Sequence, residues 1–341
     1  MDEFEVGPSN PKELAKPPPG RVAGSGRVGS STAVARLKTL GPWAIAAGIL
    51  YYLFADASIA EAWDAARSAR LELFLPAMLS VVFFWFLIDS TAFSFLFTRY
   101  NAFLSGAEAR SLRGMTYLLT PINWNLGTAA VILHLRTSKN IGALDSTSTM
   151  MLYQTIDGIL LAGYVVLGVV LLADSPETQS LRNIALGFVC FQLISLIVFM
   201  GKRPSWEWLE RLRSRGFFRS FQMATPGDIG VLLGLKALYF AAWIGIYWLG
   251  CQSFGIELPL RLAIAATPAI LLVGALPITP AGLGTQQAAM LYFFSPYGEE
   301  AAILAFGLTF PVALILFRCM IGLRYMSDLP KLRRAVAVEA G

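Results

Sequence analysis

The feature that most constrains this chain is a series of long apolar segments with few charges. They cover residues 73–97, 150–173, 183–200, 229–254 and 301–326, with a shorter one at 40–55. A helix needs about 20 apolar residues to cross the hydrocarbon core of a bilayer, and most of these segments meet that length. Overall, 56% of the residues are hydrophobic and only 14% are charged, a surplus that no water-soluble core of this size needs. The sequence therefore predicts an all-α, polytopic integral membrane protein.

Composition also divides the chain into a membrane domain and two flanking tails. Residues 1–38 are rich in Pro, Gly, Ser and charge, which predicts a disordered cytoplasmic tail. We expect the transmembrane domain at residues 39–328 and a cytoplasmic C-terminal tail at residues 329–341. The three cysteines and the single histidine form no cluster with metal-ligand spacing. We therefore expect no metal and no cofactor.

Basic residues indicate the orientation in the membrane. They concentrate in the N-terminal tail, in residues 99–113, in residues 202–219 and at the C-terminus. The positive-inside rule places all four groups in the cytoplasm, so an even number of crossings must separate each pair. Five apolar segments lie between the tail and residue 202, so one of them does not cross completely. The weakest is residues 114–134, which Pro, Asn and Gly interrupt.

An equivalent interruption lies in the second half of the chain. Residues 262–294 are too long for one helix and are broken at residues 276–284, with the sequence LPITPAGLG. If each broken segment enters and leaves on one side, the chain has six full transmembrane helices and two re-entrant hairpins. The alternative is eight spans, in which Pro and Gly only kink ordinary spanning helices.

The two broken segments resemble each other. The sequence PINWNLGT at 121–128 matches PITPAGLGT at 277–285 with one residue inserted. Each is preceded by two spans and followed by one, and three crossings per half require opposite orientations. The sequence thus predicts an inverted repeat of about 40–173 and about 183–326, a construction that recurs in transporters. Interrupted backbone at membrane depth needs protein or a watery cavity around it, so we expect a cavity suited to an anionic head group.

Candidate cavity-lining residues come from both broken segments and the helices next to them. They are Asn123, Asn125, Gly127, Thr128, Arg136, Asp157, Pro277, Gly282, Gly284, Thr285, Gln286 and Gln287. For the glutamines, hydrogen bonding between helices is an equal alternative. For the asparagines, the alternative is a role in a turn.

Charged residues inside apolar segments form a second group of candidates. Asp89, Lys236 and Arg318 are costly if they face lipid, so they should point inward, pair or line water. In the functional interpretation, Lys236 and Arg318 attract phosphate, while Asp89 and Asp157 balance them or relay protons. In the structural interpretation, the two cations snorkel to an interface and the aspartates pair with neighbouring donors.

A family resemblance follows from these motifs. Residues 276–289, LPITPAGLGTQQAA, are similar to a leucine-proline, glycine-leucine-glycine, arginine-glutamate signature. Residues 123–136 are similar to an asparagine-proline-glycine-arginine stretch, and Asp157 stands where an acidic residue is frequent. Over about residues 40–328 the chain resembles the flippase-like transmembrane region of the lysylphosphatidylglycerol synthases.

The chain departs from that family pattern at two places. Gln286 and Gln287 replace the arginine and glutamate, and an amide pair cannot bind by charge or carry a proton. Tyr153 and Gln154 stand where charged residues are often found. No aminoacyl-transferring domain follows the last span, so we do not expect lysyl transfer to lipid.

The resemblance implies lipid-related transport. We expect a translocator that moves a phospholipid or polyprenyl-linked lipid between the leaflets of the bacterial inner membrane. Its expected partners are membrane lipids with anionic head groups. The basic and aromatic residues of 202–221 suit an anionic leaflet better than nucleic acid. No catalytic constellation indicates an enzyme; the alternatives are a membrane-embedded enzyme or accessory factor in lipid or isoprenoid-glycan biosynthesis, and a scaffold for such enzymes.

Overall fold

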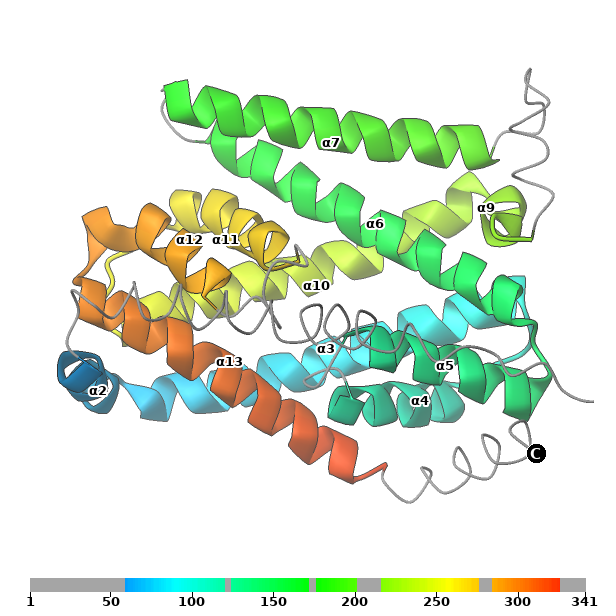
Figure 1. Cartoon of the computed structure of the whole chain (residues 1–341), viewed down its shortest axis with the longest axis horizontal. Helices are drawn as coiled ribbons and strands as arrows, with labels where there is room; N and C mark the ends of the chain where they lie inside the picture. The colour runs from blue at the N-terminus through cyan, green and yellow to red at the C-terminus, as the bar shows by residue number, and fades with distance from the viewer. Residues whose placement is uncertain (1–58, 120–123, 172–175, 201–215, 276–283, 326–341) are drawn as a thin grey trace, which may run out of the picture. The chain divides into compact units, whose positions relative to one another are not determined.

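The protein is built from helices that pack lengthwise (Figure 1). The computed structural model describes residues 59–119, 124–171, 176–200, 216–275 and 284–325, which contain helices and no strand. The helices are α2 (Ile59–Ser68), α3 (Leu71–Tyr100), α4 (Gly106–Leu119), α5 (Trp124–Lys139), α6 (Ala143–Val170), α7 (Pro176–Met200), α9 (Arg219–Met223), α10 (Pro226–Ser253), α11 (Leu260–Ala275), α12 (Thr285–Phe294), η2 (Ser295–Tyr297) and α13 (Glu300–Leu323).

The predicted fold class, an all-α membrane protein, is confirmed. Helices α3, α6, α10 and α13 are long and apolar enough to cross a membrane. With 30 and 28 residues, α3 and α10 are roughly 45 and 42 Å long, which exceeds the hydrocarbon thickness of about 30 Å. The predicted first span, 40–55, lies outside the described residues.

Local sequence explains where α10 begins. The hydroxyl of Thr225 accepts a hydrogen bond from the backbone N–H of Asp228, and the Asp228 carboxylate accepts one from the backbone N–H of Thr225. Pro226 occupies the first turn, where its missing N–H costs no helical hydrogen bond. This capping box sets the start of α10 beside the end of α3.

Helices α3 and α10 form an antiparallel central pair. At one end, the backbone N–H of Arg70 donates to the carbonyl of Ser253 at 2.9 Å. At the other end, Arg99 pairs with Asp228 at 3.1 Å. We call these the Arg70 end and the Arg99 end of the molecule.

Helices α4 and α5 form a hairpin whose base lies at the Arg99 end. They pack against each other, and Lys139 in the last turn of α5 pairs with Glu108 in the first turn of α4. The two helices have 14 and 16 residues, or roughly 21 and 24 Å. The chain therefore enters and leaves this hairpin at the same end of the molecule.

Helices α11 and α12 form a second hairpin with its base at the Arg70 end. The backbone N–H of Glu257, just before α11, donates to the carbonyl of Tyr297, just after α12, at 2.9 Å. Because α3 and α10 are antiparallel and each hairpin follows one of them, the two hairpins enter from opposite ends (Figure 1).

The two halves have equivalent packing partners. Helix α4 packs on α3 and α13, and α11 packs on α10 and α6. Helix α5 packs on α6, and α12 on α13. Even the short helices correspond, since α2 contacts α13 and α9 contacts α6. Each hairpin thus lies against the last long helix of the other half.

Small residues permit close contact between some of these helices. A Cβ atom added to Gly168 of α6 would lie 2.3 Å from the Cα atom of Ala265 in α11. One added to Gly250 of α10 would lie 2.4 Å from the ring of Phe306 in α13. Close backbone approach at small residues is a usual source of helix association in membranes.

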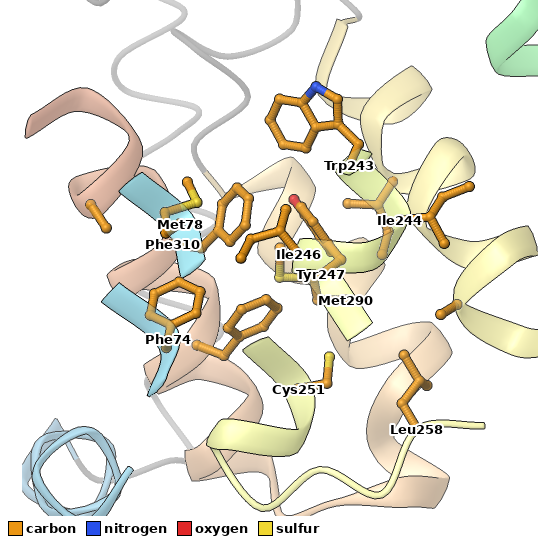
Figure 2. Close-up of a cluster of buried hydrophobic side chains, with 14 of the residues drawn as sticks. Phe74, Met78, Trp243, Ile244, Ile246, Tyr247, Cys251, Leu258, Met290 and Phe310 are labelled. Atoms are coloured by element: carbon orange, nitrogen blue, oxygen red, sulfur yellow. The ribbon is translucent and has the colours of Figure 1, made fainter. Parts of the chain in front are cut away.

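The two larger of three clusters of buried apolar side chains among the described residues fill most of the interior. The first, shown in part in Figure 2, includes Phe310, whose ring contacts those of Phe74 and Tyr247. The second includes Phe93 and Phe97 on the Arg99 side of α3. The gap between the two clusters along α3 and α10 contains the buried charged residues described next.

Candidate functional site

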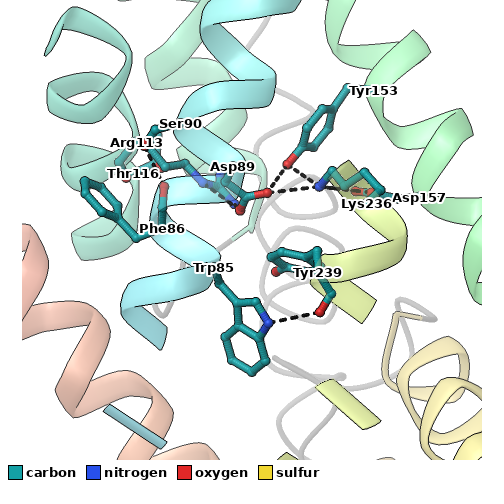
Figure 3. Close-up of polar contacts among 10 residues, drawn as sticks. All are labelled: Trp85, Phe86, Asp89, Ser90, Arg113, Thr116, Tyr153, Asp157, Lys236 and Tyr239. Carbon is teal, nitrogen blue, oxygen red and sulfur yellow. Dashed lines mark hydrogen bonds and ion pairs between the residues drawn. The ribbon is translucent and has the colours of Figure 1, made fainter. Parts of the chain in front are cut away.

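Asp89 of α3 is the centre of a buried charged cluster (Figure 3). Its carboxylate is completely buried. It accepts hydrogen bonds from Arg113 Nη2 at 2.5 Å, from Lys236 Nζ at 3.0 Å and from the Tyr153 hydroxyl at 2.6 Å. One carboxylate therefore contacts two cations, which leaves an excess of positive charge that a second acid must balance.

Asp157 of α6 is that second acid. Lys236 Nζ lies 3.0 Å from Asp157 Oδ1 and also donates to the Tyr153 hydroxyl at 2.5 Å. The ammonium group lies 3.8 Å from the centre of the Tyr153 ring and 4.6 Å from that of Tyr239. Cation–π contacts of this kind add to the attraction where water is excluded. Asp89, Asp157, Arg113 and Lys236, which we call the charged cluster, balance one another.

Helical spacing brings the members of the cluster together. Tyr153 and Asp157 stand four residues apart on α6 and so share one face of that helix. Asp89 lies about 16 Å along α3 from Tyr100, and Lys236 about 15 Å along α10 from Pro226. Both distances are close to half the thickness of a hydrocarbon core. The cluster thus joins α3, α4, α6 and α10 near the middle of the long helices.

Asp157 is the outermost member of the cluster. Its side chain is 24% exposed, whereas that of Asp89 is fully buried. Its Oδ1 atom contacts Lys236 but lacks a well-oriented hydrogen bond. Of the two acids, Asp157 is therefore the one with a partly accessible side chain.

A small pocket adjoins the cluster at the beginning of α5. It is lined by Phe93, Arg113, Thr116, Gly127, Thr128, Val131, Met150, Tyr153 and Gln154. Its free volume of about 10 Å³ is close to that needed by one ordered water molecule. Gly127 and Thr128 lie near the start of α5, and the N-terminal end of a helix favours negative charge nearby.

The family comparison agrees with this membrane architecture. Residues 40–322 match the family described as the lysylphosphatidylglycerol synthase TM region. The chain belongs to this family. As a lysylphosphatidylglycerol synthase TM-region protein, it is a multi-pass membrane protein of lipid metabolism, and the resemblance predicted from residues 276–289 is confirmed. No curated protein matches the chain significantly.

In this member of the lysylphosphatidylglycerol synthase TM family, the first broken segment borders the charged cluster. Gly127 and Thr128 line the pocket beside Arg113, and Asp157 belongs to the cluster itself. Arg136 is exposed in the last turn of α5. Asn123 lies outside the described residues, and Asn125 belongs to α5 without a described side chain.

The residues of the second broken segment have a different environment. Gln287 is 2% exposed; its carbonyl accepts from the backbone N–H of Gly284 at 2.7 Å, and its amide donates to the carbonyl of Gly307 at 2.8 Å. This is the hydrogen bonding between helices that the sequence left open as an alternative. Gln286 lies directly on Gly274 of α11, and Thr285 is buried.

The backbone conformation at position 284 explains why a glycine stands there. Its φ of 85° lies in the left-handed region, which costs other residues more than glycine. The structure thus accounts for Gly284 as the residue before α12. Pro277 and Gly282 lie outside the described residues.

One expectation about a cation was wrong, and one of the two interpretations of Lys236 is excluded. Arg113 was counted among cytoplasmic basic residues, but it is only 7% exposed and pairs with Asp89. Lys236 does not snorkel to an interface, because it is 1% exposed and lies between two carboxylates. The spacing of Arg113 and Tyr117, one helical turn apart at the start of an apolar run, was the available signal for an inward-facing arginine.

Proposed function

We propose that this protein translocates a lipid head group between the two leaflets of a bacterial inner membrane. The observation that carries the proposal is the charged cluster, which lies near the middle of the long helices and includes Arg113 of the first of two hairpins that enter from opposite ends. Phospholipids and polyprenyl-linked lipids both have polar or anionic head groups that cross hydrocarbon slowly. Buried charges at this depth are costly and typically mark a pathway for polar substrates.

The hairpins support a re-entrant, inverted-repeat arrangement. Helices α4, α5, α11 and α12 have 14, 16, 16 and 10 residues, or about 15 to 24 Å. Each is shorter than the hydrocarbon core of about 30 Å, so each would end inside it. The equivalent packing partners of the two halves fit the same arrangement. Transporters with inverted repeats place their substrate sites where such interrupted helices meet.

The charge distribution supports an orientation. The Arg99 end carries Arg99, Arg110 and Arg136 as exposed basic residues, with Lys139 at the hairpin base. The Arg70 end mixes basic residues with Glu257, Glu299 and Glu300. The positive-inside rule then places the Arg99 end in the cytoplasm. The basic residues in the sequence of both tails favour the same side for the termini.

The small size of the pocket defines what transport requires. A space for about one water molecule cannot hold a phospholipid head group. Transport therefore involves a second conformation in which the space between α4, α5 and α6 widens. In the conformation that the structure describes, the pocket beside the charged cluster is closed to a head group.

A vesicle assay tests the proposal. The purified protein is reconstituted into vesicles that contain a phosphatidylglycerol with a fluorescent head-group label, and loss of outer-leaflet fluorescence on adding an impermeant quencher is followed over time. Transport predicts a faster and more complete loss than in protein-free vesicles. Equal curves for vesicles with and without the protein would remove the proposal for this lipid class, and a polyprenyl phosphate probe extends the test.

Variants connect the activity to the charged cluster. We expect Lys236→Met to slow flipping strongly, because Asp89 and Asp157 lose their shared cation. Lys139→Met makes the same chemical change at the hairpin base and should flip as wild type. If Lys236→Met does not fold, the nearly isosteric variant Thr128→Val tests the pocket instead. In cells, an altered leaflet distribution indicates transport, whereas a missing lipid species indicates an enzyme or accessory factor in biosynthesis.

A further inference from the structure

Arg318 of α13 is a cation that the charged cluster does not balance. Its Nε atom is buried and has no hydrogen-bond partner. Among the described residues no carboxylate forms an ion pair with it, since the acids of the cluster pair with Arg113 and Lys236. Three cations and two carboxylates leave this region with one excess positive charge.

Tyr117 of α4 lies next to Arg318 and also has an unused polar group. The Arg318 guanidinium is 5.2 Å from the centre of the Tyr117 ring, and that of Arg113 is 5.3 Å from the same ring. Tyr117 is 1% exposed, yet its hydroxyl has no hydrogen-bond partner. Buried polar groups in folded proteins are nearly always hydrogen bonded. Two neighbouring donors without an acceptor, Arg318 Nε and the Tyr117 hydroxyl, therefore indicate a site for a ligand.

Arg318 lies deep along the α4 hairpin and away from its base. A Cβ atom added to Gly322, one turn beyond Arg318, would lie 2.7 Å from the side chain of Leu118, next to Tyr117. Tyr117 itself is about 17 Å along α4 from its first residue, Gly106. The guanidinium therefore does not reach the Arg99 end, and an unbalanced charge at this depth calls for an anion.

We propose that Arg318 and Tyr117 bind the phosphate group of a lipid between α4 and α13. A guanidinium offers parallel N–H donors that match phosphate oxygens, and a tyrosine hydroxyl adds a further donor. Ile315, three residues before Arg318 and so on the same side of α13, is 39% exposed, a surface suited to an acyl chain. The proposal rests on lipid transport as the proposed function, and it names the phosphate as the group that is recognised.

Lipid binding to the detergent-purified full chain tests the proposal by native mass spectrometry. The probe is dioleoyl phosphatidylglycerol, titrated against wild type, Arg318→Gln, Arg318→Lys and Tyr117→Phe. Losing a charge-assisted hydrogen bond should weaken binding about tenfold or more in Arg318→Gln. We expect a smaller loss in Arg318→Lys and Tyr117→Phe. Arg324→Gln, at an exposed arginine near the end of the same helix, is the matched control and should bind as wild type.

Competition identifies the source of the phosphate. If millimolar inorganic phosphate displaces the lipid, the site takes phosphate groups from water as well; if the lipid remains bound, the acyl chains contribute and the ligand is a lipid head group. Both results support a phosphate site, provided that binding depends on Arg318. Equal lipid affinity in wild type and Arg318→Gln would overturn it. Where Arg318→Gln does not fold, as judged by thermal unfolding, Tyr117→Phe decides: unchanged binding overturns the site.

Binding and transport fail in different ways. Wild type that binds lipid through Arg318 but does not flip it in vesicles would preserve the site and remove the transport proposal. If wild type flips lipid but Arg318→Gln binds lipid as tightly as wild type, transport is preserved and the site is removed.

Discussion

At the scale of single residues, Asp89 shows how a buried charge is tolerated in this protein. Both cations that it contacts are also buried, so water screens none of the three charges. A buried ion pair contributes little net stability compared with apolar residues, but removing one partner leaves an uncompensated charge. Arg113 depends on Asp89 most, because Asp89 is the one carboxylate that pairs with it among the described residues, whereas Lys236 also pairs with Asp157.

We expect Asp89→Asn to lower the free energy of unfolding in detergent by about 3 to 5 kcal/mol. The amide keeps the shape of the side chain but leaves Arg113 without its ion pair. Glu108→Gln, the same chemical change in the partly exposed pair with Lys139, should cost at most about 1 kcal/mol. Denaturant titration of both variants checks this; a loss for Asp89→Asn no larger than that for Glu108→Gln would contradict it.

At the scale of helices, the crossing of α6 and α11 depends on the absence of a side chain at Gly168. The Cβ atom of any other residue would meet the backbone of Ala265, which cannot move aside as a flexible side chain can. Gly163, on the same helix, has nothing within 4 Å of the equivalent position. Alanine substitutions at these two glycines therefore distinguish the effect of helix packing from that of helix propensity.

Gly168→Ala should lower the free energy of unfolding by about 1 to 3 kcal/mol through overpacking. Gly163→Ala should leave it unchanged or raise it, because alanine favours the helix by up to about 1 kcal/mol. Thermal unfolding of the two variants measures the difference. Equal melting temperatures would mean that α6 and α11 do not approach as closely as described.

The base of the first hairpin should respond to acid. The hydrogen bond from Lys139, and then the backbone N–H of Ser105, lower the pKa of Glu108 from 4.5 to about 2. A lowered pKa in the folded state gives stability that is present above the unfolded value and is lost as the pH falls toward the folded one. The stability advantage of wild type over Glu108→Gln, below about 1 kcal/mol for so exposed a pair, should therefore shrink between pH 4.5 and 2. Melting temperatures across this range check it; an advantage independent of pH would contradict the pairing.

At the scale of the whole molecule, the two hairpin bases should lie on opposite sides of the membrane. In a chain whose three cysteines are replaced, we expect Ala107→Cys and Ser138→Cys to react with an impermeant thiol reagent only from the cytoplasmic side. Glu257→Cys and Glu299→Cys should react only from the other side. All four positions are exposed. Labelling of Ala107→Cys and Ser138→Cys from opposite sides would contradict a re-entrant first hairpin.

Much of the helical architecture could be predicted from sequence, and less of the site. Apolar length identified α3, α6, α10 and α13, because bilayer thickness imposes a minimum on any spanning helix. The interruptions near Pro121 and Pro277 separate α4 from α5 and α11 from α12. The partners of Asp89 were not predictable in this way, since Lys236 is 147 positions away in sequence and no local pattern connects them.

The sequence alone determined that this chain is a helical membrane protein, where its long helices are interrupted and to which family it belongs, because these depend on local composition and short motifs. Only the tertiary structure decided that Arg113 faces inward, that Gln287 joins two helices and that Arg318 lies beside Tyr117. The physical reason is that a buried charge is stabilised by whichever groups packing brings within a few ångströms, and packing is a property of the assembled helices.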